Sequence, residues 1–228
     1  MPTSAAAPAH APVAQSAVDR VAAAVRADIL SGALAPGSPL REESAAEHYA
    51  VSRHTVRAAF QRLVAERLAV AEAYRGVRVT SFDRDQVIAL QQLRAALEVE
   101  AVRIAGERFG LGEEWPASVL APARDALDRL DAIREREEFG EPVDWLEVER
   151  IHADFHRALV AASASPRIIE THTALGSELL LFLLHVRPHY TLGSLIAEHR
   201  ALLDELPSRG PSALREHLEH STRLLVDG

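Results

Sequence analysis

Apolar residues recur every three or four positions from Val18 to Ile29, which is the spacing of one helix face. This pattern predicts a helix that ends at Ser31-Gly32. Residues 34–37 read as a turn with Leu34 tucked inward, and a second short helix is expected over residues 41–49. The first 50 residues therefore predict a pair of helices separated by a turn.

Ser52 is of a residue type that caps helix N-termini, and it predicts a third helix. On this helix Val56, Phe60 and Leu63 form an apolar stripe, and polar side chains fall on the other side. Two short alternating runs follow, 68–73 and 77–80, and residues 74–76 between them suit the turn of a hairpin. Three helices followed by a hairpin describe a winged helix-turn-helix.

Three stretches of this region, in order, resemble one family. ILSGALAPGSPL, AVSRHTVRAAFQRL and YRGVRV are similar to the DNA-binding domain of GntR-type bacterial transcriptional regulators. The resemblance covers about 65 residues and implies a DNA-binding function. The second helix departs from the family pattern, with Glu43 where an arginine is common, Ala45 where a leucine is usual, and Ala50 in place of a turn glycine.

An arginine on a helix that enters the major groove can donate two parallel hydrogen bonds to the O6 and N7 atoms of guanine. Arg53 and Arg57 are four residues apart and share a face, with His54 beside them. In the hairpin, Gly76 permits a close backbone approach and Arg75 could enter the minor groove. The alternative is that these are ordinary solvated side chains. The candidate DNA-binding residues are Ser52, Arg53, His54, Arg57, Arg75 and Gly76.

From residue 84 onward the patterns are all helical, and the breaks between them predict six helices. LRAALEVEAVRIA, FHRALVAAS and EHRALLDEL resemble the FCD effector domain of the FadR-type branch of GntR regulators. The fold class is therefore mainly α, a winged helix-turn-helix followed by a helical bundle. The expected organisation is a disordered tail (1–17), a DNA-binding domain (18–80), a linker (81–85) and an effector-binding and dimerisation domain (86–228).

Composition narrows this assignment. The chain has 228 residues, 48% of them hydrophobic, and no apolar run approaches the length of a membrane span, so we expect a soluble, cytoplasmic protein with no membrane partner. It has no cysteine, which leaves His, Asp and Glu as metal ligands. Residues 18–80 hold nine arginines against seven acidic residues, whereas the rest holds 16 against 26. Only the first part is suited to DNA.

Histidines in the helical half are the candidate metal ligands. His152 and His156 lie four apart on one predicted helix, with Glu149 as a candidate hydrogen-bond acceptor for His152. Many FCD domains hold a metal through an Asp, a His four residues later and two further His. The resemblance places His156 at the second position and His199 at the third, with His152 in place of the Asp. Asp154 faces the opposite side of the helix, because two residues correspond to about 200° of rotation.

The fourth ligand is His217 or, as an alternative, His220, and the apolar stripe of the last helix favours His217. An all-imidazole site suits zinc, or nickel or copper, better than magnesium or calcium. The alternative for each histidine is a hydrogen-bonded core residue. His172, His185 and His189 are interpreted mainly as structural or surface residues.

These features favour a dimeric repressor that binds a palindromic operator and responds to a small organic acid bound near the metal. Arg94 and Arg187 are candidates to clamp the carboxylate of that effector, with structural salt bridges as the alternative role. A metal-dependent hydrolase is the second hypothesis, but the chain lacks HExxH, GxSxG, P-loop and dinucleotide-binding motifs. A third is a DNA-binding factor whose metal is purely structural. We therefore expect no enzyme activity.

Overall fold

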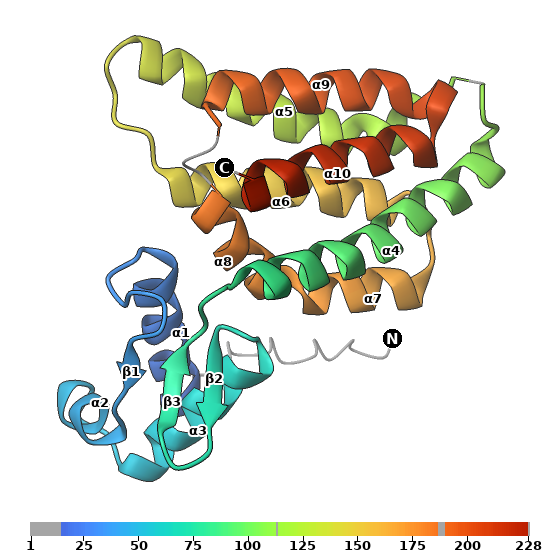
Figure 1. Ribbon diagram of the computed structural model, residues 1–228. Coiled ribbons are helices and arrows are strands. Elements are labelled where there is room, and N and C mark those ends of the chain that lie inside the picture. Colours follow the sequence, from blue (N-terminus) through green and yellow to red (C-terminus); the bar gives the residue numbers. More distant parts are fainter. Residues whose placement is uncertain (1–14, 113, 187–189, 228) are drawn as a thin grey trace, which may run out of the picture.

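The computed structural model describes residues 15–112, 114–186 and 190–227 (Figure 1). Most of the predicted tail, residues 1–17, lies outside these ranges. The elements are α1 (Ala17–Leu30), β1 (Pro39–Leu40), α2 (Glu42–His48), α3 (Arg53–Ala65), β2 (Ala69–Glu72), β3 (Gly76–Val79), α4 (Arg84–Phe109), α5 (Ala117–Glu138), α6 (Trp145–Ala161), α7 (Pro166–Ala174), α8 (Gly176–Val186), α9 (Leu192–Arg209) and α10 (Pro211–Asp227). The fold is mainly helical, as expected.

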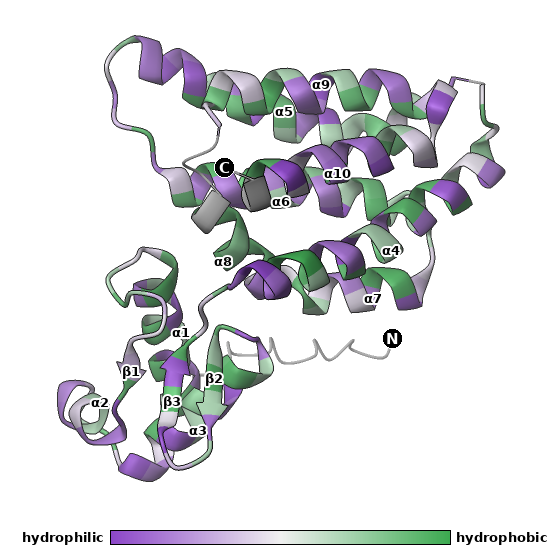
Figure 2. Cartoon of the chain, in the orientation of Figure 1, coloured by the Kyte–Doolittle hydropathy of each residue, from purple (hydrophilic) through white to green (hydrophobic). Residues whose placement is uncertain are grey.

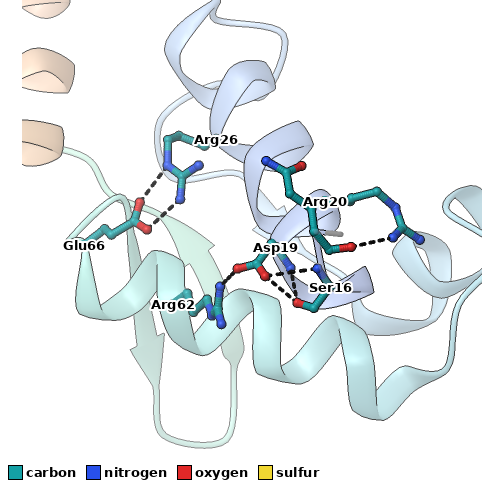
Figure 3. A network of polar contacts seen from close by, with 7 residues as sticks. Ser16, Asp19, Arg20, Arg26, Arg62 and Glu66 are labelled. Atoms are coloured by element: carbon teal, nitrogen blue, oxygen red, sulfur yellow. Dashed lines mark hydrogen bonds and ion pairs between the residues drawn. The ribbon is translucent and has the colours of Figure 1, made fainter. Parts of the chain in front are cut away.

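Helices α1 to α3 and a small sheet form the winged half. A capping box between Ser16 and Asp19 starts α1, and the apolar face predicted for it is buried against α3. Arg26 on α1 forks onto Glu66 at the end of α3, with bonds of 2.7 and 2.6 Å, and Arg62 pairs with Asp19 (Figure 3). These polar contacts hold α1 and α3 together beside their apolar interface.

The sheet has three antiparallel strands in the order β1-β3-β2. The hairpin β2–β3 is the one that the alternating runs predicted, with Ala69 opposite Val79 and Glu72 opposite Gly76. Strand β1 was not predicted. It has two residues, too few to show an alternating pattern, and it is defined by pairing with β3 at Arg78 and Val77, about 40 residues away in sequence.

The described part of the helical half contains seven helices rather than the six predicted. The difference lies in residues 166–186, which the sequence pattern presented as one helix. The structure divides them at Leu175, whose amide bonds to the carbonyl of His172, and α8 begins at Gly176. The main core of this half joins α4, α5, α6, α9 and α10 around large buried side chains such as Leu130, Phe155 and Leu206.

Helix α8 is apolar on two faces, and each face packs into a different half of the protein. Leu181 is buried in the core of the winged half, together with Val25 and Phe60. Phe182 and Leu179 belong to a separate cluster with Leu90 of α4. Figure 2 shows the apolar colouring of α8 between the bundle and the winged half. The two halves are therefore packed directly against each other.

Among the residues that the structure describes, no helix is both long enough and apolar enough to span a bilayer.

Candidate functional site

The first candidate site is the exposed face of α3. Ser52 caps the helix by accepting a hydrogen bond of 3.1 Å from the amide of Thr55, as its residue type predicted. Val56, Phe60 and Leu63 are buried against the rest of the winged half. This orientation leaves Arg53, His54 and Arg57 in solvent, and the side chains of both arginines are 64% exposed.

Acidic residues of α2 lie beside these arginines. Arg57 donates to both carboxylate oxygens of Glu42 at 2.9 and 2.7 Å, and Arg53 pairs with Glu43. The hydrogen bonds from Arg57 lower the pKa of Glu42. Because exposed ion pairs of this kind contribute little to stability, both arginines can exchange a carboxylate for a phosphate or a base edge.

The hairpin β2–β3 carries the predicted wing. Gly76 has a φ of +80°, a conformation that glycine adopts without steric cost. Arg75 is 75% exposed, and its nearest acidic partner is Glu72 at 3.9 Å. Tyr74, for which the sequence suggested only a turn, is fully exposed at the tip with a φ of +65°. The wing thus presents a cation and an aromatic ring to solvent.

The second candidate site is a histidine cluster inside the helical half. His152 and His156 lie one turn apart on α6, and His199 faces them from α9. One ring nitrogen from each lies within 4.8 Å of the other two, and the three residues are only 4%, 2% and 3% exposed. The Nε2 atoms of His156 and His199 are 3.2 Å apart. The structure thus brings three of the predicted metal ligands together.

Each of these histidines uses its other nitrogen on an acceptor. Nδ1 of His152 donates to Glu149 at 3.1 Å, as predicted, Nδ1 of His156 donates to Glu98 at 2.8 Å, and Nδ1 of His199 donates to the carbonyl of Leu195 at 2.7 Å. This arrangement fixes the hydrogen on Nδ1 and leaves the lone pair on Nε2. Three lone pairs therefore converge in the cluster, and Nε2 of His152 is buried with no hydrogen-bond partner.

The ring of His217, on α10, lies against this cluster. Its centroid is 4.5 Å from that of His199 and 5.6 Å from that of His156. His220 is half exposed, and its Nε2 lies 3.8 Å from a carboxylate oxygen of Glu198. Of the two alternatives from the sequence, the structure therefore places His217 beside the other histidines.

Burial lowers the pKa of His152, His199 and His217 well below the usual histidine value, and it lowers the pKa of His156 to about 4. The imidazoles are therefore neutral at neutral pH, which is the form that ligates metals. Asp154, by contrast, lies on the outer side of α6, where it pairs with Arg129 and Arg157. Its carboxylate is absent from the cluster, as the helical rotation predicted.

Sequence reasoning assigned no role to Glu98, which is completely buried on α4. It accepts hydrogen bonds from Arg94 at 2.8 Å, from His156 at 2.8 Å and from His172 at 3.0 Å. Burial by itself raises the pKa of this carboxyl, but the charge of Arg94 and the contacts with His156 hold the pKa well below its usual range. The signal in the sequence was an acidic residue one turn after Arg94 in a largely apolar stretch.

The two predicted effector-binding arginines differ. Arg94 is 3% exposed, and among the described residues it bonds only through Nε, to Glu98. Its two terminal nitrogens remain available to a ligand. Arg187 lies outside the described residues, as does His189.

Comparison with known proteins matches each half of the chain to a known family. Residues 17–79 match the family of bacterial regulatory proteins called the gntR family, and residues 89–223 match the FCD domain. The chain is 34% identical to the uncharacterised HTH-type transcriptional regulator BphR of Paraburkholderia xenovorans (strain LB400). The similarity extends over 209 residues, which are 86% of this chain and 80% of that protein.

The HTH-type transcriptional repressor GlaR of Escherichia coli (strain K12) is 32% identical over 143 residues, which are 63% of this chain and 61% of that protein. A GntR-type transcriptional regulator from Rhodococcus sp. RHA1 has a similar structure, with a TM-score of 0.65 and 28% identity over 92% of each chain. The relatives are regulators, so the hydrolase hypothesis is not supported. This protein belongs to the GntR family of bacterial transcriptional regulators and carries an FCD domain.

Proposed function

We propose that the protein is a dimeric repressor that binds a palindromic operator and is controlled by a small carboxylate effector and a transition metal. One observation carries the proposal. An exposed arginine-bearing helix and a buried triple-histidine cluster occur on one chain, in halves that pack directly against each other through α8. A ligand bound in the helical half therefore has a physical route to the DNA-binding half.

DNA recognition is assigned to the N-terminal end of α3 and the wing. Arg53 and Arg57 contact base edges in the major groove, with His54 beside them, and Ser52, which caps the helix, contacts a phosphate. Arg75 reaches the minor groove from the turn that Gly76 permits. A single module of this size makes few base contacts, so tight binding requires two half-sites and a dimer.

The histidine cluster fits a transition metal. Two lone pairs that face each other at 3.2 Å repel unless a cation lies near both, and a third lone pair, on His152, has no partner. His152, His156, His199 and His217 would hold the ion, and four imidazoles suit zinc or nickel. When bound, the metal supplies a Lewis-acidic centre that ties α6, α9 and α10 together.

The space beside the cluster bears on the role of the metal. The cavity that His152 and His199 line has a volume of about 20 Å³, which is room for about one water molecule. This observation favours a second candidate function, in which the metal is structural. The effector carboxylate is then held by Arg94, whose terminal nitrogens are free of protein partners in the described structure.

Selection of bound sequences from random DNA by the full-length protein tests the proposal. The expected product is a palindrome, bound by a dimer in sedimentation. Arg53→Ala and Arg57→Ala should each weaken binding by about 1–3 kcal/mol and leave the dimer intact. Arg124→Ala, an exposed arginine on α5, is the matched control. Wild-type affinity in both α3 variants would refute the recognition assignment, and a monomer bound to one half-site would refute the dimer.

A further inference from the structure

A cavity of about 340 Å³ lies between the two halves of the protein. Its walls come from α4, α6, α7 and α8 of the helical half and from α1 of the winged half. It is much larger than the space beside His152 and His199, and it falls within the size range of small-molecule sites. It touches the histidine cluster at one point, His156, whereas His152 and His199 line the smaller space, and Arg94 lines both.

The polar part of the wall is cationic. Arg150 on α6 lines the cavity and has no ion-pair or hydrogen-bond partner among the described residues. Arg94 is buried there with both terminal nitrogens unbonded within the same described ranges. Glu98, the one carboxylate among the described residues of the wall, is balanced by Arg94, His156 and His172. An anion in the cavity therefore meets two guanidinium groups that can bind it, and the negative charge of Glu98 is already neutralised by its own partners.

The rest of the wall is largely apolar. Leu30 of α1 and Leu179, Leu180 and Leu183 of α8 line it. An inorganic anion would leave this surface uncovered, whereas an acid with a hydrocarbon body would cover it. The two kinds of wall together describe a ligand with one carboxylate and a compact apolar body.

We propose that the cavity between the halves binds a small monocarboxylate with an apolar body, of the size of benzoate or hexanoate. Arg150 and Arg94 hold the carboxylate by charge-assisted hydrogen bonds, and the leucines cover the body. This inference rests on the proposed function as an effector-controlled regulator. It places the effector between the halves rather than on the metal.

Such a ligand acts on the DNA-binding half directly. Arg26 and Leu30 line the cavity from α1, and Arg26 forks onto Glu66 at the end of α3 (Figure 3). A ligand that fills the cavity therefore fixes the position of α1 relative to α8, and through Arg26 and Glu66 it biases α3. The recognition helix would thus respond to a ligand that is not itself bound to the metal.

Calorimetric titration of the full-length protein tests the site, with benzoate and hexanoate as probes. Both acids should bind, and benzamide and inorganic phosphate should bind at least about tenfold more weakly. Arg150→Gln should weaken binding of both probes at least about tenfold. It removes a cation that has no partner among the described residues, so no carboxylate of the protein loses an ion pair. Arg124→Gln, an exposed arginine outside the cavity, should bind as the wild type does.

A filling variant gives an independent check. A Cβ added at Gly176, which lines the cavity, meets no atom within 4 Å, so Gly176→Leu should abolish acid binding without lowering the melting temperature. Hydrogen exchange should show greater protection of α1 and α3 when benzoate is bound. Unchanged exchange in these helices would overturn the coupling but not the site.

The site is overturned if neither acid binds the wild type, or if Arg150→Gln binds as tightly as the wild type. Equal binding of benzamide would overturn the role of the carboxylate. The same titration after chelation and dialysis should give the same affinity. Loss of binding there would place the acid on the metal and overturn the inference, whereas DNA selection and metal analysis test the proposed function independently.

Discussion

At the scale of single residues, the backbone of Ala50 carries a cost. Ala50 has a φ of +51°, in the left-handed region where a Cβ is unfavourable by about 1–2 kcal/mol. It occupies the position between α2 and α3 where a turn glycine is usual in this family. The turn is made with the wrong residue type for its conformation.

Ala50→Gly is therefore expected to raise the free energy of unfolding by up to about 1 kcal/mol, after the larger chain entropy of glycine in the unfolded state is subtracted. Urea denaturation measures the change. The same substitution at Ala65, in the last turn of α3, should instead lower stability, because glycine is a poor helix former. A loss of stability in Ala50→Gly would show that the turn is unstrained.

The histidine cluster gives a second prediction at this scale. Removal of metal from the purified protein with a chelator should lower the melting temperature by several degrees, because a ligand that binds only the native state stabilises it. His199→Ala should contain no metal and show no effect of the chelator. His220→Ala, with its exposed ring, should keep both properties.

Elemental analysis and thermal melts with and without chelator measure these two properties. If the wild type holds no metal and its melting temperature does not move, the four rings are core histidines and not metal ligands. If His220→Ala loses the metal and His217→Ala keeps it, the assignment of the fourth ligand is wrong.

Residues differ in how far their roles could be read from the sequence. The cap at Ser52 and the shared face of His152 and His156 were predictable, because local spacing determines them. Glu98 was not, because its partners His156 and His172 are 58 and 74 residues away in sequence. Such long-range contacts are set by how helices pack, and helix packing leaves no local pattern.

At the scale of elements, α8 and the turn after α3 meet through an ion pair. Glu178 on α8 lies 3.5 Å from Arg67, and one of its oxygens is buried with no hydrogen bond. Burial raises the pKa of Glu178 above its ordinary value of 4.5, and Arg67 offsets only part of that effect. The folded protein therefore favours the protonated form of this carboxyl more than the unfolded chain does.

The sign of the pH dependence follows from this shift. The folded state holds the Glu178 proton more tightly, so its stabilising contribution is complete below pH 4.5 and is lost as pH rises through the folded pKa. The side chain of Glu178→Gln is neutral at every pH. The free energy of unfolding of this variant, relative to that of the wild type, should therefore increase between pH 4.5 and 7.5. Urea denaturation at both pH values measures the difference. The opposite trend would mean that the pair with Arg67 outweighs burial.

Helix boundaries and the role of a helix differ in how far the sequence predicts them. The division between α7 and α8 was missed although Gly176 marks it, because isolated glycines also occur inside helices of this chain, such as Gly106 in α4. The two-sided apolar character of α8 was visible as a continuous apolar run. The packing of its two faces against different halves was not visible, because an apolar run of this kind is equally consistent with burial in a single core.

At the scale of the whole molecule, Leu181 joins the stability of the two halves. It is 2% exposed and lies in the core of the winged half although it belongs to the helical half. Leu181→Ala should therefore lower the free energy of opening in α3 by about 2–5 kcal/mol, as large-to-small core substitutions do. Hydrogen exchange of the α3 amides measures this change.

Phe139→Ala is the control, because Phe139 is an exposed large apolar residue on the helical half. Its effect on α3 should be within about 0.5 kcal/mol. If the α3 amides of Leu181→Ala exchange as they do in the wild type, the winged half is stable on its own. The contact with α8 would then contribute nothing to its stability.

The position of α8 also bears on the construction of chimaeras. A hybrid that joins residues 17–79 to the FCD domain of another regulator replaces Leu181 with a foreign side chain, although it leaves every residue of the winged half intact. The winged half would then meet an unmatched surface. A working hybrid must therefore take the face of α8 that contacts the winged half from the same protein as the winged half. The boundary between the exchangeable parts then runs along α8 and not across the linker.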